Sequence, residues 1–308
     1  MSLILADARQ IPLRDGCVQC VVTSPPYFGL RDYGVDGQIG LEATPDAYVQ
    51  QMVAVFRDVR RVLADDGVCW LNLGDSYAST PAGNTDATFS AKQSSNAGSS
   101  ARRTRTTIAP GVKPKDLLGI PWRVAFALQA DGWYLRSDII WHKPNPMPES
   151  VTDRPTKAHE YLFLLTKNER YFYDAAAVRE ANSYTDRRGD ARIKYAGRGA
   201  DAARNDKDAD WFGQSADGRN KRSVWTVATM PYSGAHFATM PEKLVEPCIL
   251  AGSRLGDRVF DPFIGSGTVG AVAERLGRRW VGTDLNPKYH DLARKRTAQR
   301  GIPFEGVA

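Results

Sequence analysis

The sequence predicts an α/β fold with a mostly parallel, doubly wound sheet of the Rossmann-like type and one inserted lobe. Short apolar runs bounded by turn residues alternate with segments of helical period, which is the pattern of strands joined by crossover helices. The 308 residues are enough for one large α/β core with a smaller appended lobe. No internal repeat interrupts the pattern, so a repeat architecture is not expected.

The helix with the clearest sequence signature follows Thr44 and Pro45. Thr44 is a good N-cap, Pro45 suits the first helical position, and the apolar residues that follow recur at helical spacing. We expect Asp65-Asp66-Gly67 to end this helix and Val68–Leu73 to be a buried strand. The first strand is expected at Val18–Thr23, further strands at Tyr134–Trp141, Tyr161–Thr166, Arg258–Asp261 and Trp280–Thr283, and further helices at Leu117–Ala130, Pro241–Ala251, Thr268–Leu276 and Pro287–Gln299.

Two segments depart from the core pattern. Residues 78–115 are rich in small and polar residues and end in a basic run with no acid, which predicts a mobile loop. A disordered insertion and a loop that closes on nucleic acid explain this composition equally well. Residues 179–222 are polar, mixed in charge and without the periodicity of the core, which predicts an inserted lobe. We therefore divide the chain into residues 1–170, 171–225 and 226–308.

The overall composition bounds the class of protein. A net charge of +6 favours a polyanionic partner, although many basic proteins have none. No apolar run reaches the ~20 residues needed to cross a bilayer, and the start of the sequence lacks a secretory signal, so we expect a cytoplasmic protein without a membrane partner. Cys17 and Cys20 have no second pair at a zinc-ligand distance, so we expect reduced thiols and no metal site.

The segment Val259–Thr268 runs from a strand through a turn with two glycines into a helix. Such glycines let a ligand approach the backbone and the amide groups of the helix N-terminus. The next strand ends in Asp284, whose carboxylate can accept hydrogen bonds from both hydroxyls of a ribose or, alternatively, cap the following helix. The segment lacks the third glycine of the dinucleotide-binding fingerprint, and the sequence has no GKS or GKT phosphate-binding loop. Asp261 would repel a pyrophosphate and suit an ammonium group, which favours an adenosyl ligand carrying an amino acid.

A second motif, Thr23-Ser24-Pro25-Pro26-Tyr27, directly follows the first expected strand. The prolines fix the local backbone and remove two amide donors, which leaves the Ser24 hydroxyl and the Pro25 carbonyl as acceptors. We expect the ring of Tyr27 to be exposed beside them. Acceptors beside an aromatic ring suit a flat base with an exocyclic NH2 group, while the pentapeptide alone is also compatible with a plain Pro-Pro turn.

Together the two motifs resemble those of the amino-methyltransferases of DNA. Their order, with Ser-Pro-Pro-Tyr first and Asp-Pro-Phe-Ile-Gly-Ser-Gly-Thr last, resembles the beta class of that family. The resemblance covers most of the chain and includes the stretches Ile140–Pro148 and His236–Leu244. It implies a circularly permuted methyltransferase sheet, with the catalytic half in residues 1–170, the cofactor-binding half in residues 226–308, and target recognition in the lobe between them.

The resemblance further implies S-adenosylmethionine as cofactor, double-stranded DNA as substrate, a homodimer, and a restriction-modification setting with a cognate endonuclease. Asp284 would hold the ribose, the segment His236–Lys243 would cover the methionine tail, and Asp7 would touch adenine. The catalytic residues implied by the family are Ser24, Pro25, Pro26 and Tyr27, and the cofactor-binding residues are Asp7, Thr23, His236, Lys243, Asp261, Phe263, Gly265, Gly267, Thr268 and Asp284.

The implied chemistry is direct methyl transfer to a flipped base. An exocyclic amine is a weak nucleophile, and acceptors at Ser24 and Pro25 would stabilise the positive charge that develops on its nitrogen. Tyr27 would hold the base by stacking. Within the family, serine at the first position commonly accompanies N4 of cytosine and aspartate N6 of adenine. We therefore favour cytosine N4, with adenine N6 as the alternative.

Other functions are less favoured by the sequence. Methylation at C5 of cytosine needs a thiolate, and Cys248 of the Pro247-Cys248 pair lies in an expected helix as a buried thiol. An RNA or protein-amide methyltransferase and an inactive DNA-binding protein stay open as rivals. His142 is expected to be structural, and its loop to form a wall of the base pocket. Basic residues expected to contact phosphates are Arg136, Arg154, Lys157, Arg187, Arg188, Arg192 and Lys194.

Overall fold

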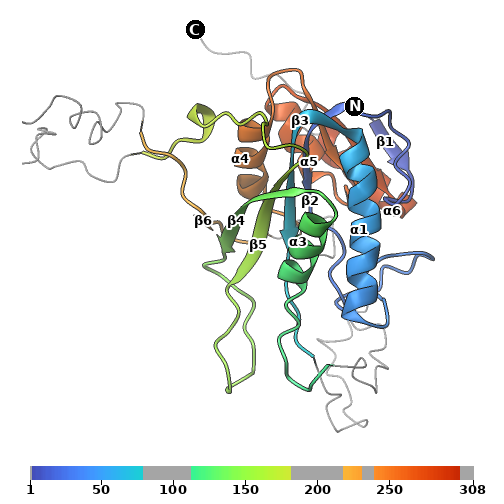
Figure 1. Ribbon diagram of the computed structural model, residues 1–308, viewed down its shortest axis with the longest axis vertical. Coiled ribbons are helices and arrows are strands. Elements are labelled where there is room, and N and C mark those ends of the chain that lie inside the picture. The colour runs from blue at the N-terminus through green and yellow to red at the C-terminus, as the bar shows by residue number, and fades with distance from the viewer. Residues whose placement is uncertain (1, 79–111, 182–217, 231–238, 299–308) are drawn as a thin grey trace, which may run out of the picture.

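A single sheet of eight strands organises the residues that the computed structural model describes, which are 2–78, 112–181, 218–230 and 239–298 (Figure 1). The strand order is β1-β8-β7-β2-β3-β5-β4-β6, and all neighbours are parallel except that β5 runs antiparallel to both β3 and β4. The prediction of a mostly parallel, doubly wound sheet is confirmed. The strands are β1 (Ser2–Leu5), β2 (Val18–Thr23), β3 (Leu63–Leu73), β4 (Tyr134–His142), β5 (His159–Thr166), β6 (Val224–Thr226), β7 (Arg258–Asp261) and β8 (Arg279–Asp284).

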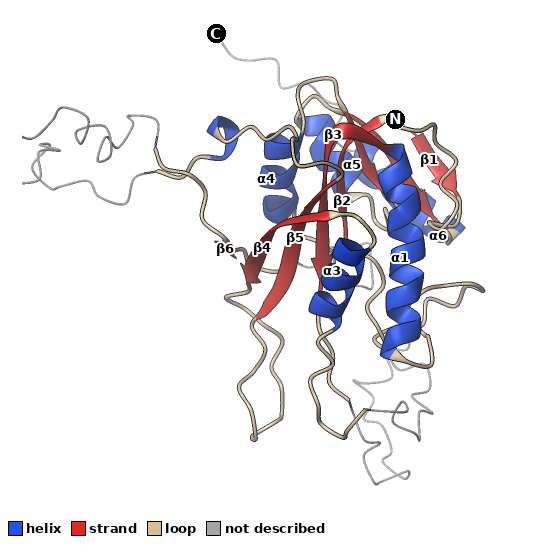
Figure 2. Ribbon diagram, in the orientation of Figure 1, coloured by secondary structure: helices blue, strands red, loops and turns tan. Residues whose placement is uncertain are grey.

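Helices flank the sheet on both faces (Figure 2). One apolar cluster, which includes Phe56, Leu71 and Phe163, joins one face to α1 and α3. A second cluster, which includes Trp70 and Leu162, joins the other face to α4 and α5. Burial on both faces explains why the central strands are almost continuously apolar. The helices are α1 (Pro45–Val62), α3 (Ile120–Ala130), α4 (Glu242–Gly252), α5 (Thr268–Arg275) and α6 (Pro287–Ala298), with a 3-10 turn η1 (Ala176–Val178).

Most predicted elements are confirmed to within three residues. The N-terminus of α1 has the expected cap, because the Thr44 hydroxyl accepts a hydrogen bond from the Ala47 amide at 3.1 Å and Pro45 opens the helix. Two strands were not predicted. β1, four residues long, pairs only with β8, and β6, three residues long, pairs only with β4. Edge strands this short carry too few residues for a recognisable alternation of polar and apolar positions.

The prediction that Asp65-Asp66-Gly67 ends α1 is wrong, because these residues lie inside β3. The helix passes directly into the strand at Leu63. Val18 of β2 lies opposite Leu63 and Cys20 lies opposite Val68, with a register irregularity between the two pairs. β3 accommodates its additional residues there as a bulge. Asp65 and Asp66 therefore lie near the amino-terminal end of the strand, and the apolar residues that follow them stay in the sheet.

The inserted lobe leaves the fold after η1 and returns before β6. At this neck Glu180 and Arg219 exchange both backbone hydrogen bonds at 2.9 Å. Residues 182–217 of the lobe and 79–111 of the expected loop lie outside the described residues, so these two predictions stay untested. Within the described ranges, no helix is long and apolar enough to cross a membrane, and no cluster of three or more His, Cys, Asp or Glu side chains could hold a metal ion.

Candidate active site

The two sequence motifs follow neighbouring strands. β2 and β7 are parallel, with Cys20 opposite Val259 and Val21 opposite Phe260, so their carboxyl ends meet at one edge of the sheet. From this edge the chain leaves in opposite directions, because α1 leads to β3 on one side and α5 leads to β8 on the other. Such a divergence is the switch point at which doubly wound sheets bind ligands. The fold therefore assembles one candidate site from both ends of the chain.

A buried hydrogen bond joins the motifs directly. The Thr23 hydroxyl donates to Asp261 Oδ1 at 2.7 Å, and the Phe263 amide donates to the same oxygen at 3.0 Å. Asp261 is 3% exposed, and burial raises the pKa of its carboxyl to about 7 despite these two donors. Its other oxygen, Oδ2, accepts no hydrogen bond from the described residues. A desolvated carboxylate with one unused oxygen suits a cationic ligand group.

The glycines of the turn have different roles. Gly267 starts α5 with a φ of +83°, and a Cβ there would lie 2.8 Å from the Ala293 Cα of α6. An added Cβ on Gly270 would lie 2.9 Å from the Trp280 ring. Gly265 differs, because among the described residues the only atom within 4 Å of its added Cβ is the Phe263 carbonyl oxygen at 3.8 Å. Gly267 and Gly270 thus permit close packing, whereas Gly265 borders open space where a ligand can approach the backbone.

Asp284 ends β8 next to this turn. Its Oδ2 accepts from the Gly265 amide at 3.1 Å, and its Oδ1 accepts from the Asn286 amide at 2.8 Å, just before α6. The capping alternative is therefore present in the structure. Burial raises the pKa of the Asp284 carboxyl. Each carboxylate oxygen has a second lone pair, so the caps leave acceptor capacity for ligand hydroxyls.

Arg296 of α6 supports the turn from beneath, and the sequence motifs gave no signal for it. Its guanidinium is buried and donates to the Ser266 hydroxyl at 3.1 Å and the Thr268 hydroxyl at 2.7 Å. The Glu242 carboxylate, at the start of α4, lies 3.3 Å from the same guanidinium. Thr268, predicted to line the cofactor, thus uses its hydroxyl to bind an internal arginine.

The Ser-Pro-Pro-Tyr motif forms a compact turn after β2. The Ser24 hydroxyl donates to the Tyr27 hydroxyl at 3.3 Å, and the Tyr48 hydroxyl donates to the Pro26 carbonyl at 2.9 Å. The prediction of an exposed Tyr27 is wrong, because the ring is half-buried and lies so close to Gly74 that an added Cβ there would meet it at 2.5 Å. No described residue donates to the Pro25 carbonyl.

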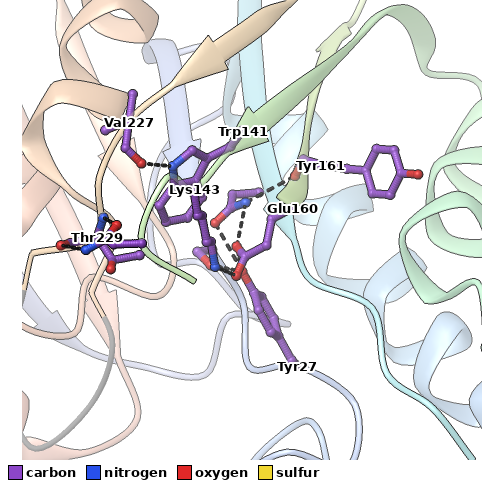
Figure 3. Close-up of polar contacts among 10 residues, drawn as sticks. Tyr27, Trp141, Lys143, Glu160, Tyr161, Val227 and Thr229 are labelled. Atoms are coloured by element: carbon purple, nitrogen blue, oxygen red, sulfur yellow. Dashed lines mark hydrogen bonds and ion pairs between the residues drawn. The ribbon is translucent and has the colours of Figure 1, made fainter. Parts of the chain in front are cut away.

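Two polar residues that the sequence analysis missed, Glu160 and Asn72, contact the Tyr27 hydroxyl, and a third, Lys143, is joined to them through Glu160 (Figure 3). This hydroxyl lies 2.6 Å from Glu160 Oε2 and 3.1 Å from Asn72 Oδ1. Lys143 pairs with the other oxygen of Glu160, and its ammonium lies 4.4 Å from the centre of the Trp141 ring. Burial, followed by the negative charge of Glu160, raises the pKa of the Tyr27 phenol well above its usual range, so it donates to this network.

Two aromatic residues near Asp284 also escaped the sequence analysis. Tyr33, in the loop after the Ser-Pro-Pro-Tyr motif, and Tyr289, on α6, pack edge to face with ring centres 6.4 Å apart. Asp284 contributes to raising the pKa of each phenol after the larger effect of burial. These rings are therefore candidates to flank a planar group beside Asp284.

The other predicted cofactor residues are Asp7, Lys243 and His236. Asp7 follows β1, whose last residue pairs with Asp284, so Asp7 lies at the edge of the sheet that carries the glycine turn. Its carboxylate is engaged by Arg9 at 2.5 Å. This pairing lowers the pKa of Asp7. Lys243 is exposed on α4 and lines a hollow with Trp225 that contains no residue of the turn. His236 lies outside the described residues.

The other residues singled out from the sequence have internal partners. His142 Nδ1 lies 3.1 Å from the Thr226 hydroxyl, which agrees with a structural role. Arg154 pairs with Glu149 at 2.6 Å and covers the Tyr77 ring, and Lys157 lies 3.7 Å from Asp75. Arg136 donates to the Tyr171 hydroxyl at 3.2 Å. Arg187, Arg188, Arg192 and Lys194 lie outside the described residues.

Comparison with known proteins identifies the family of the chain. The sequence matches the family of N6 and N4 DNA methylases over residues 18–295. It is 49% identical over 292 residues to the Type II methyltransferase M.Cfr9I of Citrobacter freundii, covering 95% of this chain and 84% of that protein. It is 47% identical over 301 residues to the Type II methyltransferase M.SmaI of Serratia marcescens, covering 97% of this chain and 91% of that protein.

Two solved structures share the fold. PvuII DNA methyltransferase, which is cytosine-N4-specific, has a TM-score of 0.63 at 18% identity and covers 98% of this chain and 88% of its own. The protein TTHA0409 of Thermus thermophilus, complexed with S-adenosyl-L-methionine, has a TM-score of 0.59 at 22% identity and covers 98% of this chain and 95% of its own. The sequence match over most of the chain, on a fold that brings both motifs together, shows that this protein belongs to the N6/N4 DNA methylase family of amino-methyltransferases.

Proposed function

We propose that the protein uses S-adenosylmethionine to methylate an exocyclic amino group of a base in double-stranded DNA, N4 of cytosine in preference to N6 of adenine. The observation that carries the proposal is the 2.7 Å hydrogen bond between Thr23 and Asp261. It joins the turn suited to a cationic, adenosyl-type ligand to the turn that offers acceptors to an amino group. Family membership and the identity to Type II methyltransferases support DNA as the substrate.

The described residues fit the cofactor. S-adenosylmethionine would supply an electrophilic methyl group. Asp261 Oδ2 would pair with its ammonium group, and the open side of Gly265 would admit its methionine portion. Asp284 would accept from the ribose hydroxyls, and Tyr33 and Tyr289 would flank adenine.

The Ser-Pro-Pro-Tyr turn would act on the target amino group. The Ser24 hydroxyl and the Pro25 carbonyl would accept hydrogen bonds from the NH2 and stabilise positive charge on its nitrogen. The nitrogen would gain the methyl group as the bond between that carbon and the cofactor sulfur breaks, which leaves S-adenosylhomocysteine, and it would lose one proton to Ser24 or to water. Most of the remaining barrier reduction would come from alignment of the flipped base, with the uncovered surface of the Tyr27 ring stacked on it.

Cytosine N4 is favoured because Ser24 occupies the first position of the motif, where members that act on adenine N6 commonly carry aspartate. The preference is a family correlation, since a serine hydroxyl can accept from either amine. Cytosine C5 chemistry is disfavoured, because Cys248 is fully buried in α4 and burial raises the pKa of its thiol. No cysteine lies within the Thr23–Tyr27 turn.

The lobe of residues 171–225 is proposed to read the target sequence, because it lies between the catalytic half and the cofactor-binding half of the chain. The described part of its neck is basic, with Arg219, Lys221 and Arg222 all within 4 Å of Glu180. A homodimer and a cognate restriction endonuclease stay predictions of the family resemblance, and a cytoplasmic location stays a prediction from the composition of the sequence.

The direct test is to incubate the protein with labelled S-adenosylmethionine and, separately, with duplex DNA, RNA and bulk protein. Methylated DNA is digested to nucleosides and analysed by mass spectrometry. We expect label in duplex DNA as N4-methylcytosine, and loss of label with Ser24→Ala and with Tyr27→Ala. Label recovered as N6-methyladenine would change only the proposed target base. Label in RNA or protein alone, C5-methylcytosine, or full activity in both variants would contradict the proposal.

A further inference from the structure

The strongest feature that the proposed chemistry does not use is the polar network beneath Tyr27. It contains a partly buried ion pair, in which the side chains of Lys143 and Glu160 are 18% and 15% exposed. Removing such charges from water is costly, and a well-packed apolar pair is often at least as stable. Stability alone therefore does not explain the pair, and its place next to the Ser-Pro-Pro-Tyr turn points to a role at that turn.

The hydrogen-bond directions in this network follow from its chemistry. Glu160 Oε2 can only accept, and it lies 2.6 Å from the Tyr27 hydroxyl and 3.1 Å from Asn72 Nδ2. The Asn72 amide also donates to the Tyr161 carbonyl at 3.1 Å, which turns its own oxygen toward Tyr27. Both neighbours of the Tyr27 hydroxyl on this side are thus acceptors, so the phenolic hydrogen is directed to them.

The consequence reaches Ser24. Because the Tyr27 hydrogen is used on the Glu160 side, the oxygen of Tyr27 is left to accept, and Ser24 is the residue that donates to it, at 3.3 Å. The single hydrogen of the Ser24 hydroxyl is then directed inward. Both lone pairs of that oxygen are available to the amino group of a base.

We propose that Glu160, held by Lys143, is a positioning residue that fixes the direction of the Ser24–Tyr27–Glu160 hydrogen-bond chain and so presents the Ser24 hydroxyl as an acceptor. The proposal rests on the amino-methyltransferase function proposed above and adds residues from β5 and the end of β4 to its machinery. Figure 3 shows Tyr27 and Lys143 approaching the Glu160 carboxylate from different sides.

Glu160→Gln tests this direction with almost no change of shape. Lys143 requires an acceptor, so it holds the amide oxygen and turns the NH2 group toward Tyr27. The nearer acceptor of the phenolic hydrogen is then replaced by a donor and Asn72 Oδ1 alone remains, so the direction of the chain is no longer fixed and Ser24 no longer presents only lone pairs. We expect kcat for DNA methylation to fall about 10- to 100-fold, less than the roughly 100- to 1,000-fold cost of losing a direct contact to the reacting group, because Glu160 acts through Tyr27 and Ser24. KM for DNA and the Kd of S-adenosylhomocysteine should be unchanged.

The double variant Glu160→Gln with Lys143→Met separates direction from mere stability. Without the lysine, the amide is free to rotate and offer its oxygen to Tyr27 and Asn72, so kcat should recover relative to Glu160→Gln alone. Glu246→Gln, a partly exposed glutamate of α4 that pairs with Arg275, is the matched control and should behave as the wild type. If Glu160→Gln fails to fold, Tyr27→Phe replaces it and should lower kcat with unchanged KM.

The outcomes are distinct. Wild-type kcat in Glu160→Gln, or in the substitute Tyr27→Phe, would overturn the inference while leaving the proposed function intact. A loss in Glu160→Gln that the second substitution does not relieve, accompanied by a lower Tm, would also overturn it in favour of a structural role. If the wild-type protein methylates no amino group in DNA, the proposed function itself fails, which the first assay reveals before any variant is made.

Discussion

The glycine turn and the Ser-Pro-Pro-Tyr turn meet at one edge of the sheet but are held in different ways. The glycine turn is supported by backbone donors to Asp261 and Asp284 and by one arginine from α6. The Ser-Pro-Pro-Tyr turn depends on side chains from three other strands or their ends, namely Asn72, Lys143 and Glu160. Substitutions in the first region should therefore affect stability and cofactor binding, whereas those around the second should affect turnover.

Gly267→Ala should have the largest effect on stability. The new Cβ would lie 2.8 Å from the backbone of Ala293 at a φ of +83°, so overpacking adds to left-handed strain. We expect a loss of roughly 2–5 kcal/mol in the free energy of unfolding, measured with urea. A loss within experimental error would show that α6 does not pack on this turn as described.

Arg296→Met comes next. It leaves the Glu242 carboxylate and two hydroxyls without their shared donor, as in a broken buried ion pair. Because Glu242 is partly exposed, we expect a loss of about 2–3 kcal/mol, at or below the lower end for such pairs. Arg294→Met, on the exposed side of the same helix, is the control and should change stability little. Equal effects of the two substitutions would contradict the supporting role of Arg296.

The pH dependence of cofactor binding tests Asp261. Its folded pKa of about 7 lies above the ordinary value of 3.8, so the free protein keeps a proton that the unfolded chain releases, and stability falls as pH rises between those values. An ammonium ligand requires the ionised form. Affinity for S-adenosylhomocysteine should therefore weaken by up to about tenfold per pH unit below about 7, and level off above it. Calorimetric titration measures this.

Asp261→Asn provides the control for that titration, because it keeps the shape of the side chain and removes the charge. Its affinity should be lower at every pH and nearly independent of pH across the same range. A wild-type profile as flat as that of the variant would exclude ammonium pairing at this carboxylate.

Gly265→Ala should have the smallest effect on stability, and it sharpens the contrast with Gly267. Its added Cβ meets open space, so only the conformational strain at a φ of +47° remains, about 1 kcal/mol. Cofactor affinity should nevertheless fall, because the methyl group would occupy the side through which the ligand approaches the backbone. Full affinity in this variant would show that the cofactor does not contact Gly265.

The same contrast explains what could be predicted from the sequence. The strands that lead to both motifs are continuous apolar runs, and the glycine turn and Asp284 are local motifs. The positions of Thr23 and Asp261 at the ends of their strands could therefore be predicted from the sequence. β1 and β6 are too short to show a pattern. Glu160, Lys143 and Arg296 act through contacts with residues distant in the sequence, and a single charged residue in a strand or helix normally predicts only a solvated surface. The half-buried state of Tyr27 follows from its own long-range contacts with Asn72, Gly74 and Glu160.

The central claim is that the two turns form one active site, and a crystal structure of the protein with sinefungin tests it most directly. Sinefungin carries an amine where S-adenosylmethionine carries its transferable methyl group. We predict that its amino acid portion contacts Asp261 and Gly265 and that this amine points toward Ser24 and the Pro25 carbonyl. Electron density for sinefungin in another part of the molecule, such as the hollow beside Trp225, would contradict the account.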